Sequence, residues 1–155
     1  MLELQYTTLI PPDSPPVEDS STRRDQLYSD IAQRVSQMSR DEQIKVGCII
    51  VKDENILSMG YNGTPSGMDN KMRDEEGNSL PHVVHSEQNA LMKLAKGGGN
   101  AEGSTLYTTH SPCWTCAKLI IQAGIRRVVY RRVYDVPAVD FLINSGVHVE
   151  SIWNG

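Results

Sequence analysis

Two cysteines and one histidine stand at spacings that suit a metal site. Cys113 and Cys116 are three positions apart in SPCWTCAKLII, at the start of a segment with the pattern of an amphipathic helix. His85 stands at the start of a second such segment, HSEQNALMKLAK. Free backbone N–H groups at a helix start favour the thiolate, and zinc binds thiolates and neutral imidazole in a tetrahedron. These three residues therefore predict a zinc site.

Three protein ligands would leave one zinc position open, which is typical of a catalytic site. Zinc lowers the pKa of a water molecule toward about 7, and Glu87, two residues after His85, is the candidate proton carrier. The pattern His-x-Glu followed by Pro-Cys-x-x-Cys is the signature of zinc deaminases. A Cys-x-x-Cys pair alone would also fit a redox motif, but that role leaves His85 and Glu87 unexplained. A structural four-ligand zinc stays open, and it would need His82, His110 or Cys48.

Strand-like and helix-like segments alternate along the chain after an opening hairpin, which predicts an α/β domain with a mixed sheet. Apolar residues at spacings of four, four and three, namely Leu27, Ile31, Val35 and Met38, predict one buried face of a first helix. The predicted strands are 45–51, 56–61, 104–109, 125–132 and 147–153, and the later helices are 86–96, 112–123 and 137–145.

Composition narrows the class of protein. At 155 residues and 39% apolar content, one domain is expected. Four prolines in PPDSPPVEDSST (11–22) predict an N-terminal arm over 1–22, with the domain over 23–155. An odd count of three cysteines fits a reducing, cytoplasmic compartment.

The charge pattern and the apolar runs exclude some partners. The net charge of -4 gives no broad basic face for nucleic acid. The sequence contains no run of about 18 apolar residues, so no membrane-spanning helix is expected. The arginines of IRRVVYRR (125–132) are expected to form a solvated strand face, and contact with a neighbouring subunit or a nucleotide phosphate is the alternative.

Four stretches resemble the deoxycytidylate (dCMP) deaminases of the cytidine deaminase superfamily, in order and spacing over roughly 23–152. They are SRDEQIKVGCIIV (39–51), GYNGTPSG (60–67), HSEQNAL (85–91) and SPCWTCAKLIIQAGIRRVVY (111–130). Ser86 stands where that family usually has alanine. The resemblance implies a three-layer α/β/α sandwich with a mixed five-stranded sheet, one Zn2+ per chain, and hydrolysis of dCMP to dUMP, which would supply thymidylate synthesis.

The same resemblance implies a set of site residues. His85, Cys113 and Cys116 would be zinc ligands, Glu87 the proton shuttle, and Asn62 a nucleotide contact. Asn62 could instead only serve the geometry of a turn. The other substrate-binding candidates are Thr109 and Ser111 at the pyrimidine, Arg40 and Lys45 at the phosphate, and Tyr134 as a cover. Arg40 and Lys45 could instead be ordinary surface charges, and Tyr134 could serve only packing.

Regulation and assembly are implied in the same way. Members of this family are commonly homohexamers that dCTP activates and dTTP inhibits. Glycines permit close approach of the backbone to phosphate, so the effector candidates are Gly60, Tyr61, Gly63 and Asp69. Rival functions are deamination of dCTP, cytidine or tRNA adenosine, or a zinc-stabilised binding module without turnover.

Overall fold

Helices and strands alternate as predicted in the computed structural model, which describes residues 20–152. Residues 1–19 of the predicted arm lie outside that range. No helix in the described range is long and apolar enough to cross a bilayer. The elements are α2 (Ser20–Ser36), β1 (Gly47–Lys52), β2 (Asn55–Tyr61), α3 (Ser86–Lys96), β3 (Thr105–His110), α4 (Trp114–Gln122), β4 (Arg127–Arg132), α5 (Val136–Asn144) and β5 (His148–Ser151).

The strands form one five-stranded sheet in the order β2-β1-β3-β4-β5. β1 pairs with β2 and with β3 in antiparallel register, whereas β3, β4 and β5 run parallel. Parallel neighbours need a crossover connection, and α4 and α5 supply these two crossovers. The mixed sheet predicted from the sequence is confirmed.

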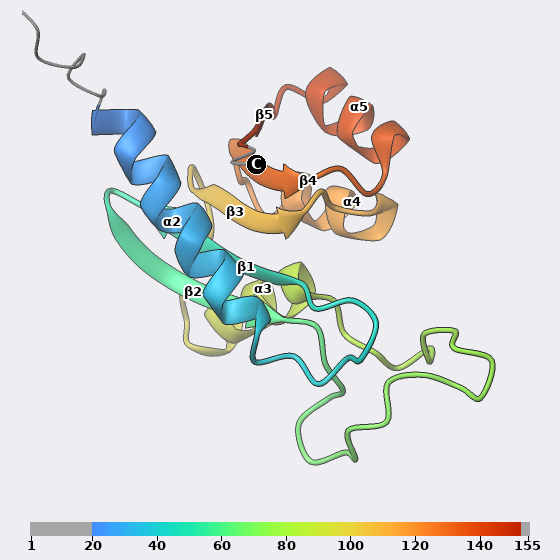
Figure 1. The fold of residues 1–155 in the computed structure, drawn as a ribbon. Coiled ribbons are helices and arrows are strands. Elements are labelled where there is room, and N and C mark those ends of the chain that lie inside the picture. Colours follow the sequence, from blue (N-terminus) through green and yellow to red (C-terminus); the bar gives the residue numbers. More distant parts are fainter. Residues whose placement is uncertain (1–19, 153–155) are drawn as a thin grey trace, which may run out of the picture.

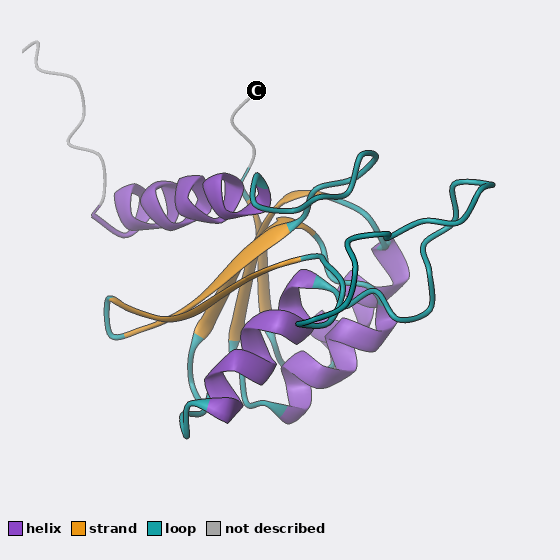
Figure 2. Cartoon of the chain, turned by 90° about the horizontal axis from the view of Figure 1, so that it is seen from below, coloured by secondary structure: helices purple, strands orange, loops and turns teal. Residues whose placement is uncertain are grey.

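The sheet lies between two helical layers, with α2 on one face and α3, α4 and α5 on the other (Figures 1 and 2). Side chains of β1 alternate between the layers, as a pleated strand requires. Ile49 and Val51 pack in the cluster that contains α2, while Cys48 and Ile50 pack in the cluster that contains the other helices. The predicted three-layer α/β/α sandwich is therefore confirmed.

The buried face of α2 agrees only in part with the predicted one: Val35 is buried and Ile31 packs against the core. Leu27 and Met38 are 53% and 63% exposed, and Met38 lies beyond the helix end, so their predicted burial is wrong. The side chains against the sheet include Tyr28, Ala32 and Val35. The small Ala32 lets the helix approach closely: a Cβ added to Gly47 of β1 would lie 2.5 Å from the Ala32 carbonyl oxygen.

Arginines of β4 anchor α2 instead of forming a solvated face. Arg127 donates to the Asp25 carboxylate at 2.9 and 2.6 Å, and the Tyr107 hydroxyl donates to the same carboxylate at 2.6 Å. Arg131 donates to Ser29 of α2 at 2.7 Å. The side chains of Arg127 and Arg131 are only 23% and 19% exposed, so the predicted solvation is wrong for these two.

Asp25→Asn is expected to lower the free energy of unfolding at pH 7 by about 2 kcal/mol, because it leaves Arg127 partly unpaired in a mostly buried position. Burial alone would raise the pKa of Asp25, but hydrogen bonds from Arg127 and Tyr107 outweigh it and the pKa is lowered. A lowered folded-state pKa stabilises the fold above the ordinary aspartate value of about 3.9, and the stabilisation is lost as the pH falls below it.

Urea unfolding of the wild type and of Asp25→Asn at pH 7 and pH 3 measures this effect. The difference between the two proteins should shrink at pH 3. Asp30→Asn is the matched control, because the Asp30 side chain that pairs with Arg131 is 67% exposed. A difference that is as large at pH 3 as at pH 7 would contradict the role given to the Asp25 charge.

Candidate active site

The three predicted metal ligands meet where two helices begin. His85 directly precedes α3, Cys113 directly precedes α4, and Cys116 lies in the first turn of α4. His85 Nδ1 lies 3.4 Å from Cys113 Sγ and 3.5 Å from Cys116 Sγ. The three donor atoms all lie within 4.8 Å of one another. The fold thus joins two segments that are far apart in the sequence.

This donor set fits a zinc ion. Zinc–sulfur bonds of about 2.3 Å and zinc–nitrogen bonds of about 2.05 Å place tetrahedral N and S ligands about 3.5 Å apart. The observed separations agree with this value. Within residues 20–152 no other group of three or more His, Cys, Asp or Glu side chains converges in this way, and His82, His110 and Cys48 do not join the cluster.

Local hydrogen bonds fix the two helix starts. The backbone N–H of His85 donates to Gln88 Oε1 at 2.8 Å, and the Asn89 N–H donates to the His85 carbonyl at 2.9 Å. The Ala117 N–H donates to the Cys113 carbonyl at 2.8 Å. These bonds therefore fix the backbone positions of residues 85 and 113, whose side chains meet in the cluster.

Charge at the cluster favours a thiolate at Cys113. Hydrogen bonds from Cys116 and His85 lower the pKa of Cys113 to about 3, against the effect of burial. The hydrogen bond to Cys113 raises the pKa of His85 in turn, and the same thiolate together with burial raises the pKa of Cys116. A divalent cation binding here would displace the remaining protons, as metal binding to such donors requires.

Glu87 is buried at 4% exposure beside a cavity of about 330 Å³ that His85 and Cys113 also line. Burial raises the pKa of its carboxyl group. A cavity of this volume is within the range of small-ligand sites. Its other walls include Asp41, Ile44, Val46, Asn62, Arg73, Gly77, Asn78, Ser79, Val83, Ser86, His110, Ser111 and Tyr134.

Asn62 lines this cavity, and its side-chain amide also ties two backbone segments together. Its Oδ1 accepts from the Val46 N–H and its Nδ2 donates to the Ile44 carbonyl, both at 2.9 Å. Ser39 Oγ donates to the Asn62 carbonyl at 2.9 Å. The residue therefore holds segment 39–46 along the cavity whether or not it contacts a ligand.

The side chains of Thr109 and Ser111 bond to the protein backbone. Thr109 Oγ1 accepts from the Gly47 N–H at 3.2 Å, and Thr109 is absent from the cavity wall. Ser111 lines the cavity, and its Oγ accepts from the Tyr134 and Asp135 N–H groups at 2.7 and 3.2 Å. Tyr134, at 65% exposure, is thereby fixed at the cavity edge.

The two predicted phosphate-binding residues lie elsewhere. Arg40 and Lys45 are exposed, and neither is part of the cavity wall. Arg73 and Asp41 do line it, and sequence reasoning missed both. Arg73 lies in the long charged loop after Asn62, where the sequence shows acidic and basic residues together and nothing singles it out.

The four effector candidates lie outside the cavity wall. Gly60 is required by packing, because an added Cβ would lie 2.2 Å from the Ser86 carbonyl oxygen. The Tyr61 ring lies 5.7 Å from Lys93 Nζ. Gly63 exchanges backbone hydrogen bonds with Val84 at 3.0 and 2.8 Å, and Asp69 accepts from the Lys71 N–H at 3.0 Å.

Comparison with known proteins gives consistent matches. Residues 22–132 match the model of a family described as the cytidine and deoxycytidylate deaminase zinc-binding region. The chain is 32% identical to deoxycytidylate deaminase of Enterobacteria phage T2, over 79% of this chain and 88% of that protein. It is 41% identical to human deoxycytidylate deaminase over 61% of this chain and 57% of that protein. The crystal structure of dCMP deaminase from cyanophage S-TIM5 with dCMP and dUMP superposes with a TM-score of 0.82 and 42% identity, covering 88% of this chain and all of that one.

Proposed function

Because the chain belongs to the cytidine and deoxycytidylate deaminase family, we propose that it is a zinc-dependent enzyme that hydrolyses dCMP to dUMP and ammonia. The observation that carries this proposal is the meeting of His85, Cys113 and Cys116 beside the buried Glu87 at one cavity. The likeness to a dCMP deaminase with dCMP and dUMP bound supports the choice of nucleotide.

Each group of the site has a defined task in this reaction. His85, Cys113 and Cys116 would hold one zinc ion, which when bound supplies Lewis acidity that lowers the pKa of water to near neutrality. The Glu87 carboxylate lines the same cavity and can accept a proton there. It passes this proton to the ring nitrogen, then takes a second proton from the hydroxyl group added to the ring carbon and gives it to the amine, which leaves as ammonia, as a positioned general acid–base does. Its buried position keeps the carboxyl group away from bulk water.

The remaining cavity residues would orient the nucleotide. The Asn62 amide keeps one N–H and one lone pair beyond its two backbone bonds, and these are proposed to contact the sugar or the ring. The backbone of residues 109–111, which leads directly into Cys113, is proposed to contact the pyrimidine. Tyr134 at the cavity edge would cover the bound nucleotide.

A substrate panel tests the assignment. Ammonia release is measured from dCMP, dCTP, cytidine and tRNA, with the zinc content determined on the same protein sample. We expect dCMP to give the highest kcat/KM. Faster release from cytidine or from tRNA adenosine would contradict the substrate, and zinc-loaded protein that releases no ammonia from any of them would indicate a binding module.

Membership in this family also supports regulation and assembly like those of dCMP deaminases: activation by dCTP, inhibition by dTTP, a homohexamer and a cytoplasmic location. The segment that includes Gly60, Tyr61, Gly63 and Asp69 remains the proposed effector site. Saturation curves for dCMP with and without dCTP test this part, and identical curves would remove it. Sedimentation gives the assembly size independently of turnover.

A further inference from the structure

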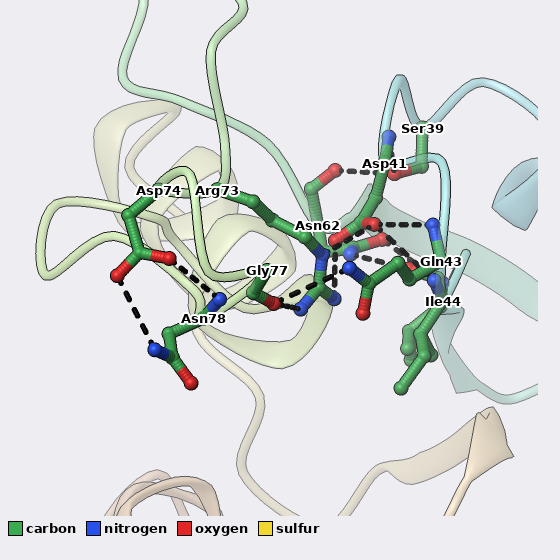
Figure 3. Close-up of polar contacts among 10 residues, drawn as sticks. Ser39, Asp41, Gln43, Ile44, Asn62, Arg73, Asp74, Gly77 and Asn78 are labelled. Atoms are coloured by element: carbon green, nitrogen blue, oxygen red, sulfur yellow. Dashed lines mark hydrogen bonds and ion pairs between the residues drawn. The ribbon is translucent and has the colours of Figure 1, made fainter.

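One arginine of the cavity wall is held in a fixed orientation by a buried carboxylate. Arg73 Nε and Nη2 donate to Asp41 Oδ1 and Oδ2, both at 2.9 Å, so the pair is bidentate. Arg73 Nη1 donates to the Gly77 carbonyl at 2.9 Å. Figure 3 shows the Arg73 side chain reaching from its loop to Asp41, with Asn62 beside the pair.

Asp41 is itself held rigidly. Its side chain is 3% exposed, and Oδ1 also accepts from the Gln43 and Ile44 N–H groups at 2.8 and 3.2 Å. Four N–H donors, two of them from Arg73, therefore hold this carboxylate in place. A planar guanidinium fixed in this way loses little side-chain entropy when it binds a further anion.

The charge of the cavity wall makes Arg73 distinctive. Among the described residues that line the cavity, Arg73 is the only lysine or arginine, and the carboxylates are Asp41 and Glu87. A guanidinium has five N–H donors, and three of them make the contacts above. The other two are available, and the Arg73 side chain is 21% exposed. A phosphate monoester carries about -1.5 to -2 charges at pH 7 and is well matched by such a group.

We propose that Arg73, positioned by Asp41, binds the phosphate of the nucleotide substrate and sets the preference for a nucleoside monophosphate over the free nucleoside. This inference rests on the proposed function, because only a nucleotide substrate brings a phosphate into the cavity. It assigns the phosphate to a residue of the cavity wall, whereas the exposed Arg40 and Lys45 do not line that wall.

The test compares substrates with and without phosphate. Arg73→Gln is expected to lower kcat/KM for dCMP by about 10- to 150-fold, the range of a lost charged hydrogen bond, mainly through KM. The kcat/KM for deoxycytidine should change by less than about 2-fold, because that substrate has no phosphate to lose. Arg73→Lys keeps the charge but loses the planar fork, so its kcat/KM for dCMP should fall between those of the wild type and Arg73→Gln.

Arg34→Gln is the matched control, since Arg34 is exposed in the last turn of α2, on the other face of the sheet. Zinc content and melting temperature are measured for every variant, so that a general structural defect is recognised. Affinities for dUMP and deoxyuridine, measured by calorimetry, give the same comparison without turnover. Arg73→Gln should weaken dUMP binding and leave deoxyuridine binding unchanged.

Two results would overturn the role of Arg73. The first is an equal loss for the phosphorylated and unphosphorylated compounds, which would make the Arg73–Asp41 pair a loop anchor only. The second is that Arg73→Gln leaves both the kcat/KM for dCMP and the affinity for dUMP unchanged. If the wild-type protein releases no ammonia from dCMP, the proposed function fails, and the ratio of dUMP to deoxyuridine affinity still decides the role of Arg73.

Discussion

Glu87→Gln is expected to reduce ammonia release from dCMP by about 10²- to 10⁴-fold and to leave the zinc content at the wild-type level. Glutamine matches the size of glutamate but cannot carry the proton, and general acid–base catalysis contributes about 10² to 10⁴ in rate. Glu87 is also absent from the three-residue donor cluster, so metal binding should not depend on it. A coupled ammonia assay and atomic absorption on the same sample measure both quantities.

Glu75→Gln, in the exposed part of the loop, is the control for a change of charge. It should keep both zinc and turnover. Turnover close to wild type in Glu87→Gln would refute the proton-carrier role. Loss of zinc together with turnover in Glu87→Gln would show instead that the carboxylate supports the metal.

Cys116→Ala is expected to lose nearly all bound zinc and, with it, ammonia release. The substitution leaves two ligands, His85 and Cys113, where a catalytic zinc site needs three. The chain offers a matched control, because Cys48 is also a fully buried cysteine. Cys48→Ala also removes one buried sulfur atom, but it should keep one zinc per chain and wild-type kcat.

Both cysteine variants should lose some stability through the space left in the core. Thermal unfolding therefore accompanies the zinc and ammonia measurements, and comparison at a temperature where both variants are folded isolates the metal effect. Full zinc content in Cys116→Ala would contradict its assignment as a ligand. Equal zinc loss in Cys48→Ala would mean that the core defect, not the missing thiolate, releases the metal.

The sequence predicted that His85, Cys113 and Cys116 would meet, and the structure brings them together, because the determinants of their positions are local. The two cysteines lie within one turn of the start of α4, and His85 lies at the start of α3, so short-range helix signals place each donor. The mixed sheet followed from the alternation of strands and helices, and the three layers from the family resemblance. Binary patterning carries this information with little dependence on distant contacts.

Contacts between distant segments escaped sequence reasoning. Arg73 and Asp41 are 32 positions apart and meet only because their two loops fold against each other. The buried face of α2 was predicted only in part: Val35 is buried, but Tyr28 and Ala32 lie against the sheet where Leu27 and Met38 were expected. Arg127 and Arg131 of β4 were misjudged because their acidic partners on α2 lie about 100 positions earlier. Periodicity within one element cannot show which opposite charges the fold will bring to it.

A zinc titration tests the central claim most directly. The protein is stripped of metal with a chelator, zinc is added back in steps, and bound zinc and ammonia release from dCMP are measured at each step. We predict no turnover without zinc, a rise in proportion to bound metal, and a plateau at one ion per chain. Full turnover by the metal-free protein, or one bound ion per chain without ammonia release from dCMP, would contradict a zinc-dependent dCMP deaminase.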